Sequence, residues 1–258
     1  MERTKIVRKL FITIFLSQVL VSTVLAFDYS RAEEIKYDVT YLGLPVVRVE
    51  VENSPIAKPD SGSYRIFASA KTTKFWSLFY PLENFYWTYL DTLGRPLIYK
   101  RIIKEKSYEN SSAQEFDHRF NRIYYEGDTA IDHPGNLQNF FSSVYKLREI
   151  PLEYGTTDSF YINVEKASWK IKWSVEGIKE LEALGRKIDC HVVDVKFESM
   201  NPDAKRLRTD ALSYNLMSED TELKLYLSND DWRLPVRMSY KLTPFDIQAK
   251  ITKFPEGY

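Results

Sequence analysis

Apolar and polar residues alternate along most of this chain. In the first clear example Ile35, Tyr37, Val39 and Tyr41 alternate with charged or hydroxyl residues. The same pattern recurs in residues 47–52, 169–176, 223–227, 236–242 and 245–251. Successive side chains of a β-strand point to opposite faces of the sheet, so the pattern predicts many antiparallel strands with one covered face.

Two segments have a helical pattern instead. Residues 73–80 are short and strongly aromatic, whereas residues 136–149 are better defined, with Asn136 as a suitable N-cap and Pro151 as a stop. The apolar positions of the second segment form a single stripe of Leu137, Phe140, Phe141, Val144 and Tyr145. We expect this helix to lie across the covered face of a sheet. Residues 199–218 have weak periodicity and are expected to form a long, mobile connection.

These elements predict a mainly β fold. We expect a single curved antiparallel sheet, or an incomplete β-barrel, wrapped around one or two short helices. One domain over residues 27–258 is expected, because 232 residues are within the range of one large β domain.

Residues 1–26 have the three parts of a signal peptide. Four basic residues precede an apolar run from Leu10 to Leu25, and Val24-Leu25-Ala26 is a suitable cleavage site. Cleavage after Ala26 would release a periplasmic protein, whereas an uncleaved segment would be an anchor. The residue after the site is Phe27 and not Cys, so the pattern is not that of a lipoprotein.

Charge and cysteine content exclude several classes. The full chain has 36 basic and 36 acidic residues, and removal of residues 1–26 leaves a net charge of −3. No strongly basic surface for nucleic acid is therefore expected. A disulfide within the chain is excluded because Cys190 is the only cysteine, so a large core must supply the stability.

No catalytic or metal-binding motif stands out. The three histidines, His118, His133 and His191, do not have the spacing of zinc ligands, and there is no nucleophile-elbow or phosphate-binding glycine motif. We therefore expect a protein that is not an enzyme and needs no cofactor or metal.

A cluster of aromatic residues between Phe75 and Tyr89 has two interpretations. Its rings can be the core beneath a short helix, or they can line an apolar cavity for a lipid-like ligand. In the second interpretation the candidate ligand-binding residues are Phe75, Trp76, Phe79, Trp87, Tyr145 and Arg148. Arg148 can hold an anionic head group at the cavity mouth, or it can be a helix-end residue with its charge in water.

Three stretches carry a resemblance to a known family. The segments EIKYDVTYLGLPVVRVEV, FFSSVYKLRE and LYLSNDDWRLPVRM resemble a bacterial exported family catalogued as domain of unknown function 3108. The likeness runs from Glu34 to Ile251. It is carried by Tyr145, Leu147, Arg148, Ser228, Asp230, Leu234, Pro235 and Val236. The resemblance implies a β-rich periplasmic protein, similar in architecture to lipoprotein carriers, and supplies no catalytic residues.

Two functional hypotheses follow from the sequence. The first is a periplasmic envelope protein that binds a lipid or another hydrophobic envelope molecule in an apolar cavity and contacts the envelope peripherally. The second is a structural or partner-binding envelope protein with no small-molecule ligand. A membrane-spanning β-barrel fits less well, because the two helices and the charged polar faces are unlike a lipid-facing barrel.

Overall fold

The fold is described from a computed structural model, which places residues 29, 31–56, 63–126, 130–164, 166–201, 210–211, 216–242 and 245–258. The predicted signal peptide, its cleavage site and the first mature residue, Phe27, lie outside these residues. The proposed division into a leader and one domain therefore stays a prediction.

One antiparallel sheet of fifteen strands forms most of the described structure. The strands are β1 (Glu33–Tyr41), β2 (Leu44–Pro55), β3 (Tyr64–Thr72), β4 (Glu83–Leu90), β5 (Pro96–Glu105), β6 (Tyr108–Asp117), β7 (Arg122–Tyr125), β8 (Ala130–Asp132), β9 (Leu137–Gln138), β10 (Thr157–Val164), β11 (Ala167–Ala183), β12 (Arg186–Ser199), β13 (Leu223–Ser228), β14 (Pro235–Leu242) and β15 (Phe245–Lys253). Their order is β8-β7-β6-β5-β4-β3-β2-β1-β15-β14-β13-β12-β11-β10-β9, and only the β9–β10 pair is parallel.

The sheet is open, although its two edges are close in the sequence. The edge strands β8 and β9 are consecutive along the chain, but neither is paired with the other. Side chains from the two ends of the sheet meet beside this seam, where the Tyr125 hydroxyl on β7 donates a hydrogen bond of 2.9 Å to Asn163 on β10. The predicted mainly β fold with a curved, incompletely closed sheet is therefore confirmed.

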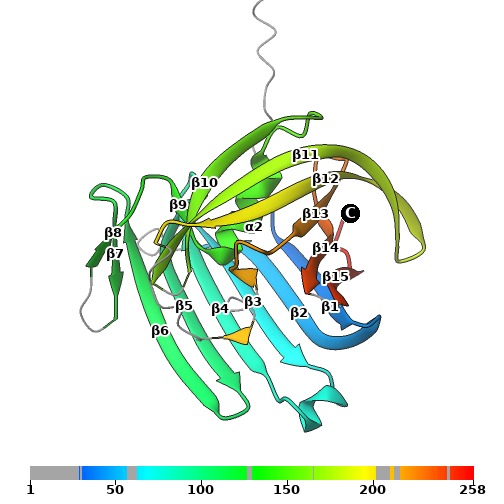
Figure 1. Cartoon of the computed structure of the whole chain (residues 1–258), viewed down its shortest axis with the longest axis horizontal. Helices are drawn as coiled ribbons and strands as arrows, with labels where there is room; N and C mark the ends of the chain where they lie inside the picture. The colour runs from blue at the N-terminus through cyan, green and yellow to red at the C-terminus, as the bar shows by residue number, and fades with distance from the viewer. Residues whose placement is uncertain are drawn as a thin grey trace, which may run out of the picture.

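Helix α2 (Phe140–Glu149) lies inside the curve of the sheet. Figure 1 shows it between strands β2 to β6 and the long arch of β10 to β12. The predicted end at Glu149 is confirmed, and Ile150 is extended, as expected for a residue before proline. The predicted start at residue 136 is wrong, because Leu137 and Gln138 pair with β10 as a short strand.

Asn139, and not Asn136, caps the helix. Its side chain accepts a hydrogen bond of 2.9 Å from the Ser142 backbone N–H, and the Ser142 hydroxyl accepts one from the Asn139 N–H. The Asn139 amide also donates to Thr88 on β4 at 3.1 Å. This reciprocal capping box satisfies two donors that would otherwise be buried without partners.

We expect Asn139→Ala to lower the free energy of unfolding by about 2 kcal/mol, the upper part of the range for a lost N-cap, because the cap is buried. Urea unfolding followed by circular dichroism measures this loss. Asn110→Ala, at an exposed position of β6, is the matched control and should change stability by less than about 0.5 kcal/mol. Equal stability of the two variants would contradict the capping role.

The helix predicted for residues 73–80 is not present. Only a single 3₁₀ turn, η2 (Trp76–Leu78), forms there, in the connection from β3 to β4. In this segment only eight residues precede Pro81, which ends a helix, and no residue of η2 is buried, so packing does not stabilise a longer helix there.

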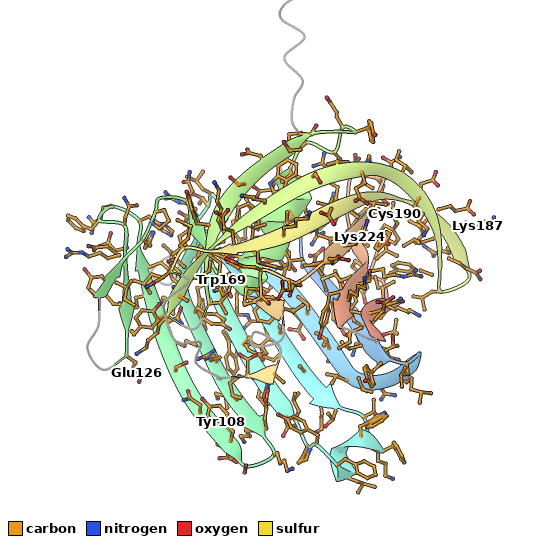
Figure 2. All side chains as sticks on the ribbon, viewed as in Figure 1. Tyr108, Glu126, Trp169, Lys187, Cys190 and Lys224 are labelled. Carbon is orange, nitrogen blue, oxygen red and sulfur yellow. The ribbon has the colours of Figure 1, made fainter. Side chains whose placement is uncertain are left out.

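The core has three groups of buried side chains. Two of them meet at α2, where Leu147 packs with residues of β10 to β13 while Phe141 and Tyr145 pack with residues of β3 to β7. The third group joins β1, β12, β14 and β15 around Ile35 and Leu234. The β11–β12 hairpin contributes Leu181 and Ile188 to this third group, and Figure 2 shows Lys187 near the end of the hairpin.

Candidate functional site

An apolar cavity of about 290 Å³ lies between α2 and the concave face of the sheet. Aliphatic side chains from both halves of the sheet line most of it, among them Ile35, Val39, Val49, Ile171, Val195, Leu225, Met238 and Ala249. The helix contributes Phe140, Phe141, Val144, Tyr145, Leu147 and Arg148. The volume is near the lower end of the range for small-molecule sites, roughly 300 to 1,000 Å³.

A buried ion pair forms one polar part of the cavity wall. Arg148 is 0% exposed and Glu33 on β1 is 4% exposed. Both terminal nitrogens of the Arg148 guanidinium donate to the Glu33 carboxylate, and Nη2, at 2.9 Å from Glu33 Oε2, also donates to the Trp232 carbonyl at 2.9 Å. The pair therefore ties the helix to β1 and to the turn between β13 and β14.

The turn between β13 and β14 is itself held by side chains. The Asp230 carboxylate accepts hydrogen bonds from the backbone N–H groups of Trp232 and Arg233. Arg233 then donates to the carbonyls of Arg148 and Ile150, both at 2.9 Å, and so satisfies acceptors at the C-terminal end of α2. We call the group of Glu33, Arg148, Asp230, Trp232 and Arg233 the Arg148 junction.

The Arg148 junction contains residues from two segments of the family resemblance that are far apart in the sequence. Ser228 belongs to the same turn, because its hydroxyl donates to Asp230 at 2.8 Å and accepts from the Leu234 N–H at 2.8 Å. The residues of the Arg148 junction, together with Ser228, therefore hold α2 against the sheet.

Electrostatics make the cavity suitable for uncharged groups. Burial raises the pKa of the Tyr37 hydroxyl and that of the Tyr145 hydroxyl well above the usual tyrosine value, so both stay neutral. The charge of Arg148 is matched by Glu33. An apolar occupant would keep these arrangements intact, whereas an anion at Arg148 would have to displace a buried carboxylate.

A second polar cluster lies at the β4–β5 side of the cavity. Glu105 on β5 is 4% exposed and accepts hydrogen bonds from Asn84 at 2.7 Å and from the Ala211 N–H at 3.0 Å. Beside it Arg101 pairs with the buried Asp210 at 3.4 Å. Asn84 and Ala211 both line the cavity.

The expected mobile connection over residues 199–218 needs correction for its described part. Asp210 is held as above, and Leu216 and Met217 are buried in the core at 7% and 2% exposure. The polar composition of this segment did not indicate that part of it is buried. Asp210 contacts Arg101 and the Ala211 N–H contacts Glu105, and both partners lie on β5, more than one hundred residues earlier in the sequence.

The six candidate ligand-binding residues separate into two places. Tyr145 and Arg148 line the cavity, whereas Phe75, Trp76, Phe79 and Trp87 do not. Phe75 and Phe79 are each 63% exposed around η2, so neither the expected pocket nor the expected core describes them. Trp87 stacks on Phe85 and contacts the tilted ring of Phe67, on the other side of β4 from the buried Tyr86.

Arg148 differs from both sequence interpretations. It does not extend its charge into water at the helix end, because the side chain is fully buried. It does line the cavity, but with its guanidinium engaged by Glu33. Sequence reasoning missed Glu33, although the two-residue repeat places it on the buried face with Ile35 and Tyr37 and places Glu34 on the opposite, partly exposed face.

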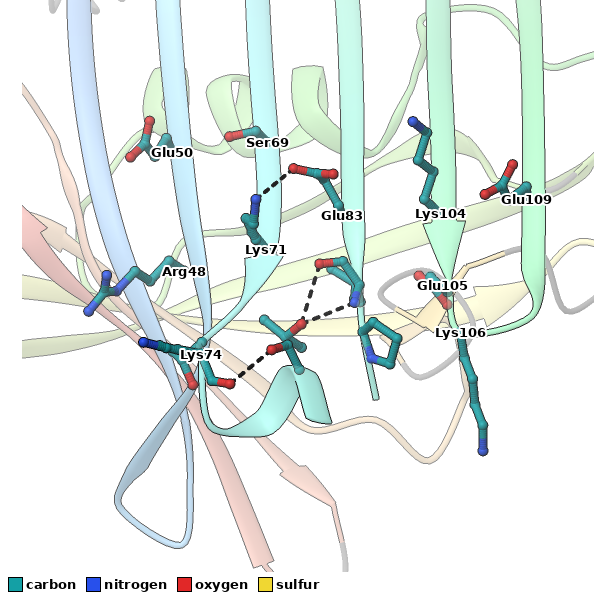
Figure 3. A pocket seen from close by; sticks show the side chains of 15 residues that line it. Arg48, Glu50, Ser69, Lys71, Lys74, Glu83, Lys104, Glu105, Lys106 and Glu109 are labelled. Carbon is teal, nitrogen blue, oxygen red and sulfur yellow. Dashed lines mark hydrogen bonds and ion pairs between the residues drawn. The ribbon is translucent and has the colours of Figure 1, made fainter. Parts of the chain in front are cut away.

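The convex side of the sheet carries a wider, polar hollow of about 780 Å³. Its walls are charged side chains of β2 to β6 and the connection between β3 and β4, including Arg48, Lys71, Glu83 and Lys104 (Figure 3). Lys71 and Glu83 form an ion pair across it at 2.8 Å.

The candidate catalytic groups are dispersed. Burial raises the pKa of the Cys190 thiol to about 12, so it is protonated at neutral pH. His191 lies next to it but bonds Asn229 at 2.7 Å. Within the described ranges no three His, Cys, Asp or Glu side chains are grouped closely enough to share a metal ion. Among the same residues no helix has the length and apolar character needed to cross a bilayer.

Comparison with known proteins identifies a family and a fold. The family model described as "Protein of unknown function (DUF3108)" matches residues 36–252. No curated protein sequence matches the chain. A β-barrel-like protein of domain of unknown function DUF1849 from Brucella abortus aligns with 86% of this chain and 96% of its own, at 11% identity and a TM-score of 0.56.

Two further solved structures align less closely. The hypothetical lipoprotein YmcC from Escherichia coli K12 has 12% identity, coverage of 93% and 92%, and a TM-score of 0.36. A DUF1089 family protein from Pseudomonas aeruginosa has 8% identity, coverage of 78% and 87%, and a TM-score of 0.32. The Brucella protein therefore supports a shared β-barrel-like fold, and the two lower scores add nothing to it.

Proposed function

The chain belongs to the DUF3108 family of proteins of unknown function, and we propose that it is a periplasmic, non-enzymatic protein that binds a hydrophobic, lipid-like molecule in the cavity beside α2. One observation carries the proposal: a cavity of about 290 Å³ lined almost entirely by apolar side chains. The signal-peptide pattern of residues 1–26 supports the location.

The form of the cavity suits an acyl chain. Its aliphatic walls are formed by strands from both halves of the sheet, and α2 forms the remaining wall. Polar groups in the wall, such as Arg148, already have partners, and an uncharged chain would leave those hydrogen bonds undisturbed. Burial of apolar ligand surface supplies the affinity.

The direct test is native mass spectrometry of the protein purified from a periplasmic extract without detergent. We expect a mature chain beginning at Phe27 together with an adduct that lipid extraction identifies as an amphiphile. A mature chain with no adduct that also fails to bind the fluorescent fatty acid cis-parinaric acid would reject the proposal.

A cavity-filling variant tests the location of binding. Ala249→Phe places a ring into the cavity from β15 and should weaken cis-parinaric acid binding about tenfold or more, because the ring occupies the ligand's volume. Fluorescence titration measures the affinity, and thermal unfolding verifies the fold. Ala113→Phe, on β6 outside the cavity, is the matched control and should bind as the wild type does. Equal affinity of both variants would place binding elsewhere.

A further inference from the structure

Exposed apolar residues gather at one end of the sheet. Twelve large hydrophobic side chains are exposed among the described residues, and five of them lie in or beside two neighbouring turns. These five are Leu42, Leu44, Phe75, Leu78 and Phe79, with exposures of 60%, 57%, 63%, 79% and 63%. We call them the apolar rim. Such a concentration is unusual on a surface that faces only water.

Hydrogen bonds and ring contacts hold the aromatic part of the apolar rim in a defined conformation. The connection between β3 and β4 is tied to β2 by hydrogen bonds from the Thr73 N–H to the Val46 carbonyl at 2.9 Å and from the Thr73 hydroxyl to the Pro45 carbonyl at 3.2 Å. The rings of Phe75, Trp76 and Phe79 contact one another, with centroids 5.4 to 6.3 Å apart. The turn thus presents its rings outward while its backbone is held.

Leu42 adds a conformational argument. Its φ is +53°, in the left-handed region that favours Gly, Asn or Asp over a branched apolar residue. A leucine at this tip, followed by Gly43, is therefore unfavourable for the hairpin and exposes 60% of the side chain. Neither backbone conformation nor packing explains its presence.

The charges beside the apolar rim are suited to an anionic surface. Lys74 and Lys106 are exposed and have no ion-pair partner among the described residues. Three of the acids in this region are engaged or buried: Glu83 pairs with Lys71, Glu50 with Lys36, and Glu105 is buried. Figure 3 shows Lys106 pointing away from the end of the sheet, while Glu50, Glu83 and Glu109 lie further along the strands.

Two residues that line the cavity are close to the apolar rim in the sequence. Val46, two residues from Leu44, and Leu82, three residues from Phe79, both line the cavity. The Leu82 backbone N–H also bonds the Thr72 hydroxyl at 3.0 Å, at the base of the aromatic turn. A molecule entering the cavity from this end would pass Val46 and Leu82.

We propose that the apolar rim is a membrane-docking surface: its side chains insert into the boundary between head groups and acyl chains of a bilayer, and Lys74 and Lys106 contact the phosphates of anionic phospholipids. Rings and leucines beside lysines are the composition of interfacial segments. The idea that a ligand enters the cavity from the docked membrane rests on the proposed function. Docking itself does not require an occupied cavity.

Vesicle flotation tests docking with protein purified after export, its N-terminus determined by intact mass. The vesicles contain phosphatidylethanolamine and phosphatidylglycerol, or phosphatidylcholine alone. We expect binding to the anionic vesicles that weakens with salt. The triple variant Phe75→Ser, Leu78→Ser, Phe79→Ser should lose more than about 50-fold in vesicle affinity. Lys74→Gln with Lys106→Gln should lose roughly tenfold or more, and only on anionic vesicles.

A matched control removes equally exposed apolar residues elsewhere. Leu93→Ser with Phe120→Ser alters turns outside the rim, at 68% and 67% exposure, and should leave vesicle binding unchanged. The proposal would be overturned if the wild-type protein did not bind the anionic vesicles, or if the triple variant bound them as well as the wild type does. Rim-dependent dimerisation in analytical ultracentrifugation without vesicle binding would also overturn it and would identify the rim as a protein interface.

The two proposals can fail separately. The triple rim variant should still bind cis-parinaric acid in solution, because its cavity is unchanged. Ala249→Phe should still bind vesicles, because its rim is unchanged. Loss of vesicle binding in Ala249→Phe with a retained fold would contradict docking through the rim alone.

Discussion

Replacing Arg148 with methionine should lower the free energy of unfolding by about 3 to 5 kcal/mol, the range for breaking a buried ion pair from one side. The substitution keeps most of the side-chain length but leaves the Glu33 carboxylate, 4% exposed, without its guanidinium. The Trp232 carbonyl loses a donor in the same step. Urea unfolding followed by tryptophan fluorescence measures the loss.

A double-mutant cycle separates the charge from the packing. Glu33→Leu combined with Arg148→Met removes both charges, and the double variant should be more stable than Arg148→Met alone, since no unpaired carboxylate remains buried. Additive losses from the two substitutions would contradict a coupled pair. Arg95→Met, whose partner Asp91 lies in a partly exposed turn, should cost no more than about 1 kcal/mol.

Phe141→Ala should cost about 3 to 5 kcal/mol, as large-to-small substitutions in a core do. Phe141 is 8% exposed, and its ring lies 4.8 Å from that of Tyr86, measured between centroids. The Phe141 ring therefore connects α2 to β4. The loss of stability is measured as a lower midpoint of unfolding in urea.

Phe75→Ala is the matched control for Phe141→Ala, since Phe75 is the same residue type at 63% exposure. It should change stability by less than about 0.5 kcal/mol. A loss below about 1 kcal/mol for Phe141→Ala would contradict the burial of the helix stripe. A large loss for Phe75→Ala would show that the aromatic turn supports the fold.

Local sequence patterns predicted most of the secondary structure. Alternation marks strands because the strand repeat is two residues, and the alternating segments at 35–41 and 47–52 lie in β1 and β2, which pair with each other. The stop at Glu149 follows from Pro151, which restricts the preceding residue. The start of the helix was missed by four residues, because pairing of Leu137 with Tyr161 on β10 competes with helix formation.

Strand irregularities show where local reasoning ends. A strict two-residue repeat along β12 puts His191 on the same face as Val193, yet Val192 and Val193 are both buried and His191 is partly exposed. The register between β11 and β12 shifts between Val175 and Gly177, opposite this position. The extra residue, Glu176, is in β11, so the bulge changes the face of the β11 residues that follow it, and its position depends on the pairing with β12.

The amino-acid sequence by itself determined that the protein is mainly β, that its alternating strands need one covered face, and that an apolar helix near residue 141 can cover it. Only the tertiary structure decided which charges are paired and where the apolar space lies. The ion pair of Glu33 with Arg148 and the bond of Glu105 to Ala211 each join residues more than one hundred positions apart. Burial and pairing are properties of the assembled sheet, so one aromatic cluster in the sequence is divided between the core, where Tyr86 is buried, and the apolar rim, where Phe75 and Phe79 are exposed.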